Sequence, residues 1–253
     1  PPILASIPIP RTPPMRTRHF GVLIPSTNTT VEIEFTRHLP PDLQFHVGRC
    51  GKDAGSPFGP SRDADVAHQS RMLGDAKVEA VSLVQTSASL HEDGYDARVR
   101  AMIEAGAGAP ASTSAEAIGE AVQALGARRI AIASPYSAEM IGRAKAYYES
   151  RYGLDVVAAE GFGATNAYAI GALSADAATE AFRRMDLRDV EVLLVPGGNF
   201  PTYAHIAAWE RAFARPVVAT NQAALWAMLR AMGVSAPLPG WGRLLEQRPD
   251  LAP

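Results

Sequence analysis

The sequence lacks several features that would indicate particular classes of protein. Its 253 residues include one cysteine, Cys50, so no intrachain disulfide can form and we expect a reducing compartment, the cytoplasm. The formal net charge is -2, without the basic excess that binds nucleic acid or an anionic membrane surface. No run of about 18 apolar residues occurs, so we expect no membrane-spanning helix. The six histidines show no metal-binding spacing, so we expect no metal site, and the glycine-containing segments match neither a phosphate loop nor a dinucleotide-binding loop.

Regular alternation of two kinds of segment fills most of the chain. Apolar runs that predict strands cover 19–28, 43–50, 79–87, 128–137, 154–163, 190–199 and 215–220, and segments typical of helices separate most of them. Alternating strands and helices predict an α/β fold with parallel sheets. The apolar runs show no clear alternation, which is typical of strands that are covered on both faces.

The second half of the chain repeats the order of the first at an offset close to 110 residues. The repeat predicts two similar lobes, each with a parallel four-stranded sheet, related by a pseudo-twofold axis. We expect an N-terminal Pro-rich arm over 1–18, a first lobe over 19–110 with part of 216–245, a second lobe over 111–215 and a C-terminal tail over 246–253. The positions that correspond are Pro25 with Pro135, Gln85–Thr86–Ser87 with Gly197–Gly198–Asn199, and Pro110 with Pro216.

Four polar loops follow predicted strands. They read "PSTNTT" (25–30), "QTSAS" (85–89), "SPYS" (134–137) and "PGGN" (196–199). Ligands of α/β proteins bind outside the carboxyl ends of the strands, so we expect these loops to line one cleft between the lobes.

These segments together resemble a known enzyme family. The stretches "GVLIPSTNTTVE" (21–32), "TSAS" (86–89), "GNFPT" (198–202), "RPVVATNQAALWAMLR" (215–230) and "PGWGRLL" (239–245) are similar to the maleate isomerase and arylmalonate decarboxylase branch of the Asp/Glu racemase superfamily. The resemblance runs from about residue 20 to about residue 245. It implies the two-lobed fold, no cofactor or metal, and a cleft where hydroxyls and backbone N–H groups hold a substrate carboxylate.

The resemblance also implies a departure from the family's thiol chemistry. Family members use one or two cysteines that face the cleft. Gln85 stands at the first of these positions and Gly197 at the second, whereas Cys50 matches neither. We therefore expect the carboxylate site to be kept and the reaction to proceed without a catalytic cysteine.

Candidate site residues follow from these loops. As catalytic residues we expect the hydroxyls of Thr86, Ser87 and Tyr136, which would stabilise an enolate. His91 is a candidate proton donor or acceptor, with Glu32 and His205 no stronger. Asn28 and Asn166 each have two readings, a helix cap or a substrate contact. The substrate-binding set is Asn28, Gln85, Asn166, Gly197, Gly198 and Asn199.

The expected function is a cofactor-independent isomerase or lyase. Its substrate would be a small mono- or dicarboxylic acid, with no nucleic acid or membrane partner; a homo-oligomer is left open. Two alternatives remain at this point. One is a hydrolase of an amide or related bond in a small carboxylic acid, and the other is a non-catalytic paralogue that kept only the carboxylate pocket.

Overall fold

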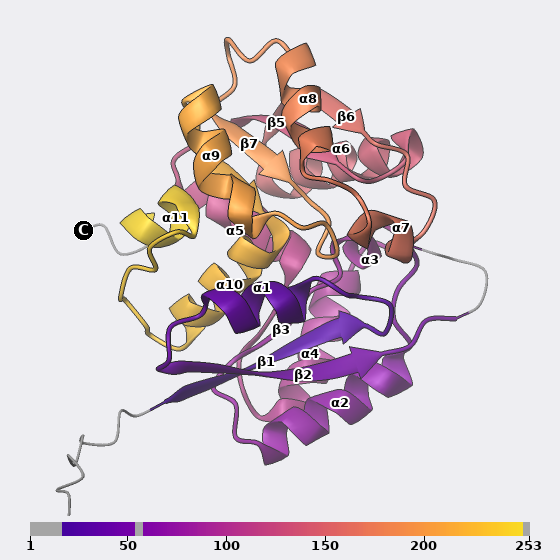
Figure 1. Cartoon of the computed structure of the whole chain (residues 1–253). Helices are drawn as coiled ribbons and strands as arrows, with labels where there is room; N and C mark the ends of the chain where they lie inside the picture. Colours follow the sequence, from indigo (N-terminus) through magenta and orange to yellow (C-terminus); the bar gives the residue numbers. More distant parts are fainter. Residues whose placement is uncertain (1–16, 54–57, 250–253) are drawn as a thin grey trace, which may run out of the picture.

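The computed structural model describes residues 17–53 and 58–249, and most of the expected arm lies outside these ranges. The protein has two lobes, each built on a parallel four-stranded sheet. Figure 1 shows the first sheet in the lower part of the molecule and the second above it. The first sheet has the order β2-β1-β3-β4, from β1 (Arg18–Pro25), β2 (Leu43–Cys50), β3 (Val81–Leu83) and β4 (Ala111–Thr113). The second has the order β6-β5-β7-β8, from β5 (Arg129–Ser134), β6 (Asp155–Gly161), β7 (Val192–Val195) and β8 (Val217–Ala219).

Two parallel sheets with the same strand order confirm the predicted fold class. The connections between parallel strands have to cross over the sheet, and helices make these crossovers. In the first half they are α1 (Val31–His38), α2 (Asp63–Asp75), α3 (Thr86–Ser89) and α4 (Tyr95–Ala107), and α5 (Ser114–Ala124) then leads from the first sheet to the second. In the second half they are α6 (Ala138–Tyr152), α7 (Ala167–Gly171), α8 (Asp176–Arg184) and α9 (Tyr203–Phe213), whereas α10 (Thr220–Ala231) and α11 (Gly242–Gln247) follow the last strand, β8.

The first sheet buries both faces. Phe20, Val22 and Ile24 of β1 point into a large apolar cluster that continues through the second lobe. Leu23 of the same strand points the other way, into a smaller cluster beneath α2 and α4. Successive side chains of a strand alternate between its faces, so burial on both sides explains the unbroken apolar run. Because the larger cluster crosses from one lobe to the other, the lobes pack on a shared core.

The structure corrects the expected lobe boundary at residue 110. β4 lies beyond it, yet pairs with β3 as the edge strand of the first sheet. Three small residues, Ala111, Ser112 and Thr113, form this strand, and so short a polar segment leaves no apolar run in the sequence. At the other end of the chain, β8 completes the second sheet, whereas α10, which follows it, packs on α5, β3 and β4.

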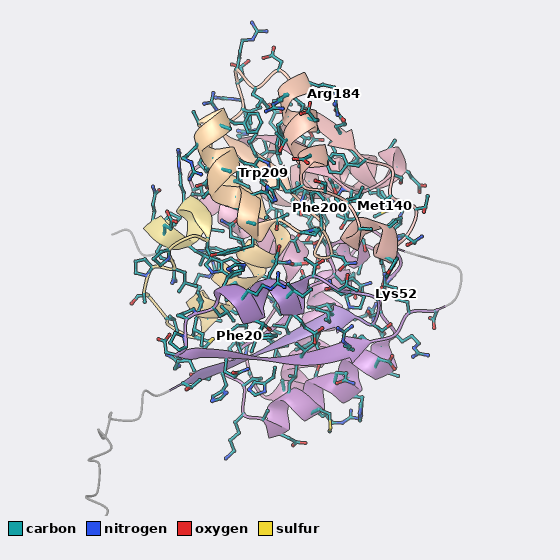
Figure 2. All side chains as sticks on the ribbon, viewed as in Figure 1. Phe20, Lys52, Met140, Arg184, Phe200 and Trp209 are labelled. Carbon is teal, nitrogen blue, oxygen red and sulfur yellow. The ribbon has the colours of Figure 1, made fainter. Side chains whose placement is uncertain are left out.

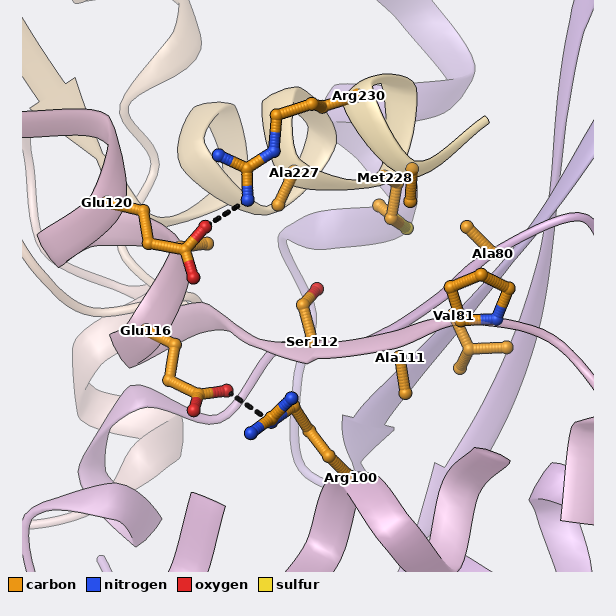
Figure 3. A pocket seen from close by; sticks show the side chains of 13 residues that line it. Ala80, Val81, Arg100, Ala111, Ser112, Glu116, Glu120, Ala227, Met228 and Arg230 are labelled. Atoms are coloured by element: carbon orange, nitrogen blue, oxygen red, sulfur yellow. Dashed lines mark hydrogen bonds and ion pairs between the residues drawn. The ribbon is translucent and has the colours of Figure 1, made fainter. Parts of the chain in front are cut away.

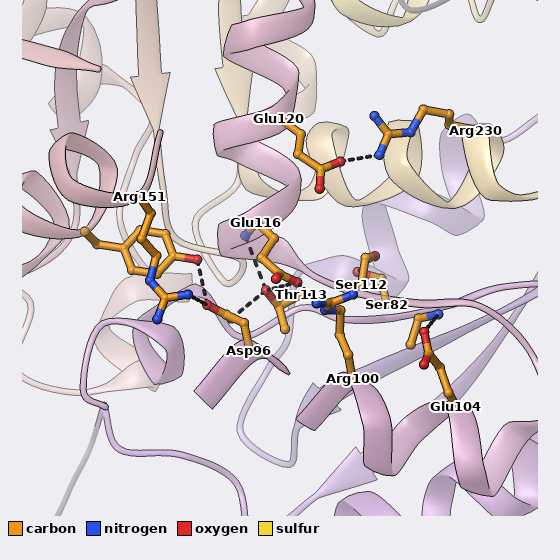
Figure 4. A network of polar contacts seen from close by, with 12 residues as sticks. Ser82, Asp96, Arg100, Glu104, Ser112, Thr113, Glu116, Glu120, Arg151 and Arg230 are labelled. Atoms are coloured by element: carbon orange, nitrogen blue, oxygen red, sulfur yellow. Dashed lines mark hydrogen bonds and ion pairs between the residues drawn. The ribbon is translucent and has the colours of Figure 1, made fainter. Parts of the chain in front are cut away.

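Buried polar contacts fix the two lobes to each other. Asp96 of α4 is 1% exposed and accepts hydrogen bonds from Thr113 Oγ1 and from Tyr147 Oη of α6, each at 2.7 Å. The Arg151 guanidinium of α6 lies 3.7 Å from the same carboxylate. Figure 4 shows this network reaching from the first lobe into the second. A buried carboxylate needs such partners, so these contacts set how the lobes meet.

No helix in the described part of the chain is both long enough and apolar enough to span a bilayer.

Candidate functional site

A cavity of about 40 Å³ lies where the carboxyl ends of strands from both sheets meet. The first lobe contributes the loops after β1, β2 and β3, and the second lobe contributes those after β5 and β7 together with α7. The predicted site residues that line it are Asn28, Gln85, Thr86, Ser87, Tyr136, Gly197, Gly198 and Asn199.

Thr86 lines this cavity and contacts two further hydroxyls behind it. Thr86 begins α3 directly after β3, and its Oγ1 lies 3.0 Å from Ser114 Oγ and 3.2 Å from Thr220 Oγ1. Thr220 Oγ1 in turn accepts a hydrogen bond from the Gly197 backbone N–H at 2.8 Å. The chain of hydroxyls therefore joins the strand ends of the two lobes. The Ser87 hydroxyl has no hydrogen-bond partner among the described residues, which leaves it available to a ligand.

Tyr136 meets these hydroxyls from the second lobe. Its side chain is 2% exposed, and this burial raises the pKa of the phenol well above its ordinary value. Hydrogen bonds with the Thr86 side chain and the Ser87 backbone act in the opposite direction but are weaker. The phenol is thus protonated at neutral pH and serves as a hydrogen-bond donor.

Gly197 adopts a backbone conformation that suits glycine. Its φ is 134°, and a Cβ at this position would lie 2.9 Å from Pro135 Cγ. A residue with a side chain would strain the loop, whereas glycine lets the backbone N–H approach Thr220 closely.

Two asparagines at opposite walls hold the loops of the cavity. Asn28 Oδ1 accepts hydrogen bonds from the backbone N–H groups of Thr30 and Val31, each at 3.0 Å, and so caps α1. Its Nδ2 donates to the Gly198 carbonyl at 3.2 Å, which leaves one amide hydrogen for a ligand. Asn199 Oδ1 accepts from the Thr29 backbone N–H at 2.7 Å. Asn28 therefore caps the helix and also lines the cavity, so the two hypotheses for this residue are compatible.

The side chain of Gln85 is hydrogen-bonded to the segment that contains Gly59 and Ser61. Its Oε1 accepts from Ser61 N at 3.1 Å and from Ser61 Oγ at 2.7 Å, and its Nε2 donates to the Gly59 carbonyl at 2.8 Å. The amide has no titratable proton. Gln85, which directly precedes Thr86, thus holds the segment around Ser61 through its side chain.

Among the lining residues that sequence reasoning did not single out, Lys52 is the one with a titratable side chain in the described part of the chain. It follows β2 by two residues and carries the only formal charge among the described residues that line the cavity. Burial lowers the pKa of its ammonium to about 8. The available signal was its place in the loop after a strand of the first sheet. The segment "GKDAGSP" (51–57) carries no hydroxyl cluster, so it did not stand out beside the four polar loops.

The structure does not bring every predicted residue to this cavity. His91 lines a separate cavity of about 390 Å³ with Arg143, and burial and the Arg143 charge lower the pKa of its imidazole. Asn166 is exposed and caps α7, since its Oδ1 accepts from Ala169 N at 2.9 Å. His205 lies on a third cavity beside α1, and Glu32 is ion-paired with Arg49. The turn of α3 points the chain away from the cavity, which explains the position of His91.

Another cavity, of about 230 Å³, lies at the opposite ends of the strands. It adjoins Val81 and Ala111, the first residues of β3 and β4. Figure 3 shows two ion pairs in its wall, Arg100 with Glu116 and Arg230 with Glu120. Its cations are already paired with carboxylates, so this cavity is poorly suited to an acidic ligand.

The single thiol is buried in the apolar core. Cys50 ends β2 with no exposed surface and packs with Leu23, Val66 and Tyr95. Burial raises the pKa of the thiol to about 12, so the reactive thiolate is scarce at neutral pH. Within the described residues, no group of three or more His, Cys, Asp or Glu side chains is arranged to hold a metal ion.

Comparison with known proteins assigns the chain to a family. The model of the arylmalonate decarboxylase family matches residues 20–245. The chain belongs to the arylmalonate decarboxylase family. This agrees with the family branch expected from the sequence.

Curated relatives and solved structures place the chain in the same branch. It is 26% identical over 245 residues to a maleate isomerase of Nocardia farcinica, covering 92% of this chain and 97% of the relative. It is 27% identical over 234 residues to an arylmalonate decarboxylase of Bordetella bronchiseptica, covering 90% and 96%. A maleate isomerase variant of Pseudomonas putida S16, solved with maleate, superposes with a TM-score of 0.81 at 25% identity over 91% of this chain and 98% of that one.

A further solved structure bears on the role of cysteine. A cysteine-to-serine mutant of the Nocardia farcinica isomerase carries a covalently bound succinylcysteine intermediate. It superposes on 91% of this chain and 99% of its own with a TM-score of 0.79, at 27% identity. That isomerase thus forms a bond through a thiol, whereas the one thiol of the present chain lies in the core.

Proposed function

We propose that this protein is a cofactor-independent isomerase or lyase that acts on a small carboxylic acid without a cysteine. The observation that carries the proposal is the group of hydroxyl donors, Thr86, Ser87 and Tyr136, which come from both lobes and line one cavity. The family relatives act on acids of this class by name, as maleate isomerases and an arylmalonate decarboxylase.

The hydroxyls suit a carboxylate that gains charge during the reaction. When the carbon beside a bound carboxylate loses CO2 or a proton, the electron pair moves onto the carboxylate oxygens and forms an enediolate. Donors already aimed at those oxygens stabilise this charge without reorganising, and each one contributes about 10²–10³ in rate. Tyr136 fits this role because its phenol stays protonated, and Ser87 fits because its hydroxyl has no other partner among the described residues.

The buried position of Cys50 supports a route without a covalent thiol intermediate. Its side chain is absent from the cavity lining, and its raised pKa opposes formation of a thiolate. The positions expected to hold the family's cysteines carry Gln85 and Gly197. The amide of Gln85 cannot act as an acid, a base or a nucleophile, and glycine has no side chain.

The test is turnover and proton exchange in D2O. Purified protein is incubated with maleate and, separately, with phenylmalonate, and the products are followed by proton NMR. We expect conversion of one acid, or deuterium at the carbon beside its carboxylate, and no inhibition by iodoacetamide. Saturable binding of both acids with neither conversion nor exchange would identify a passive binding protein instead. Release of an amine or ammonia from an amide derivative, with the free acids untouched, would identify the hydrolase.

A further inference from the structure

An enediolate needs a proton at carbon to become product, and the hydroxyl cluster does not supply it well. Tyr136 is held in its protonated form by burial, and the Thr86 and Ser87 hydroxyls are far weaker acids than an ammonium group. Among the described residues of the cavity wall, the remaining titratable side chain is that of Lys52. Figure 2 labels Lys52 at the level where the two lobes meet.

The backbone of Lys52 is fixed relative to the hydroxyl cluster. Lys52 forms an antiparallel bridge with Ser61, and Ser61 donates both its N–H and its hydroxyl to Gln85 Oε1. Gln85 directly precedes Thr86. On the other side, the Gly51 N–H donates to Asp65 Oδ2 at 2.7 Å. These hydrogen bonds fix the backbone from which the Lys52 side chain extends, and a group that transfers protons needs such a rigid support.

The charges around Lys52 favour a proton that can be exchanged. Burial lowers the pKa of its ammonium to about 8, near the pH at which a general acid–base works best. The Asp65 carboxylate beside Gly51 is already paired with Arg62 at 2.9 Å. His91 beyond α3 interacts with Lys52 electrostatically. Tyr136 faces the same cavity from the second lobe and is neutral.

We propose that Lys52 is the proton-transfer residue of this site and that its Nζ delivers a proton to the carbon of the bound enediolate. In the lyase case the bond to the departing carboxylate breaks, CO2 leaves, and the electron pair rests on the enediolate held by the hydroxyls. A C–H bond then forms with a proton from the ammonium, which becomes a neutral amine and regains its proton from water. In an isomerase step on an acid with a saturated C–H beside its carboxylate, the neutral amine takes that proton, the C–H electron pair moves into the enediolate, and the resulting ammonium returns the proton to the same carbon. This inference rests on the proposed function.

The chain contains only three lysines, Lys52, Lys77 and Lys145, so Lys52 can be observed directly. Protein labelled with ¹⁵N and ¹³C at lysine is titrated by NMR, and the Lys52→Met variant identifies the Lys52 signal. We expect that signal to titrate with a midpoint near 8 and to shift to higher pH when maleate is added, because a nearby anion favours the ammonium. The same titration is made with phenylmalonate, and a midpoint left unchanged by the acid that the protein converts would show that Lys52 does not meet the bound acid and would overturn the proposal.

Kinetics separate this inference from the proposed function. With the acid that the wild-type protein converts, Lys52→Met should lower kcat by about 10²-fold or more and abolish the limb of the pH profile near 8. Lys52→Arg should not restore it, because a guanidinium does not release its proton. Lys77→Met, the same substitution at an exposed position away from the cavity, should behave as wild type. A folded, fully active Lys52→Met protein would overturn the role of Lys52 alone, whereas an inactive wild type would overturn both proposals.

Discussion

Removing the phenol hydroxyl of Tyr136 provides a demanding test of the site. In Tyr136→Phe the ring remains in place and only the donor is lost. Loss of one such donor lowers kcat by about 10²–10³, which corresponds to about 2.7–4 kcal/mol of transition-state stabilisation. The hydroxyl should act mainly on the enediolate, so kcat and kcat/KM should fall together while KM changes little.

The structure indicates that this substitution leaves the fold intact. Thr86 Oγ1, which neighbours the phenol, keeps its contacts with Ser114 and Thr220 at 3.0 and 3.2 Å. The free energy of unfolding should therefore change by no more than about 1.5 kcal/mol, the net value of an ordinary hydrogen bond. Urea denaturation measures that change, and initial rates with the acid that the wild type converts measure the kinetic effect.

Tyr148 offers a matched control for the same substitution. It is buried in α6 of the same lobe, and its hydroxyl is without a hydrogen-bond partner among the described residues. Tyr148→Phe removes a buried polar atom that has no partner, so it should keep full activity and equal or greater stability. Equal rates for Tyr136→Phe and Tyr148→Phe, with both proteins folded, would refute the assignment of Tyr136 as an enediolate donor.

Three further predictions concern the thiol, the loop and the lysine. Cys50→Ala should keep turnover near wild type, and iodoacetamide should not reduce the initial rate; inactivation that substrate prevents and Cys50→Ala abolishes would reveal a working thiol. Gln85→Leu leaves two donors of Ser61 and the Gly59 carbonyl without their partner, and should lower the free energy of unfolding by about 1–3 kcal/mol in urea denaturation; an unchanged midpoint would contradict this. Lys52→Met should raise stability by about 1–3 kcal/mol at pH 7. In the folded protein the pKa of Lys52 is about 8, below the ordinary 10.5. Burial of the charged ammonium therefore lowers the free energy of unfolding fully below pH 8, and this loss disappears as the pH rises toward 10.5. If Lys52→Met raised the free energy of unfolding equally at pH 7 and pH 10.5, burial of the charged ammonium would not be the cause.

Contacts between the lobes explain why the cavity loops hold their positions. Glu34 of α1 is buried and accepts hydrogen bonds from the backbone N–H groups of Thr202 and Tyr203 in the second lobe, at 2.7 and 2.9 Å. Thr30 Oγ1 donates to the Asn199 carbonyl at 2.7 Å. These bonds fasten the loop after β1 to the loop after β7. Each wall of the cavity is therefore supported by the opposite lobe.

Local pattern in the sequence was enough to predict the two-lobed fold and most of the cavity. Apolar runs that end in polar residues place Thr86 after β3, Tyr136 after β5 and Gly198 after β7, and parallel strands bring such ends to one edge of each sheet. A repeat near 110 residues was sufficient to predict that two such edges exist. These features depend on neighbours along the chain, which is why they can be recognised without coordinates.

Tertiary structure alone decided which loop side chains enter the cavity. Lys52 reaches it because Ser61 and Gln85 hold its loop through hydrogen bonds across 24 residues of sequence, and no local pattern records such bonds. His91 lies only a few residues beyond Thr86, yet the turn of α3 carries it into another cavity. β4 escaped prediction because an edge strand of three residues is stabilised by its pairing with β3 rather than by its own composition. The direction of a loop side chain and the pairing of an edge strand both depend on contacts between distant segments, and those contacts form only in the folded chain.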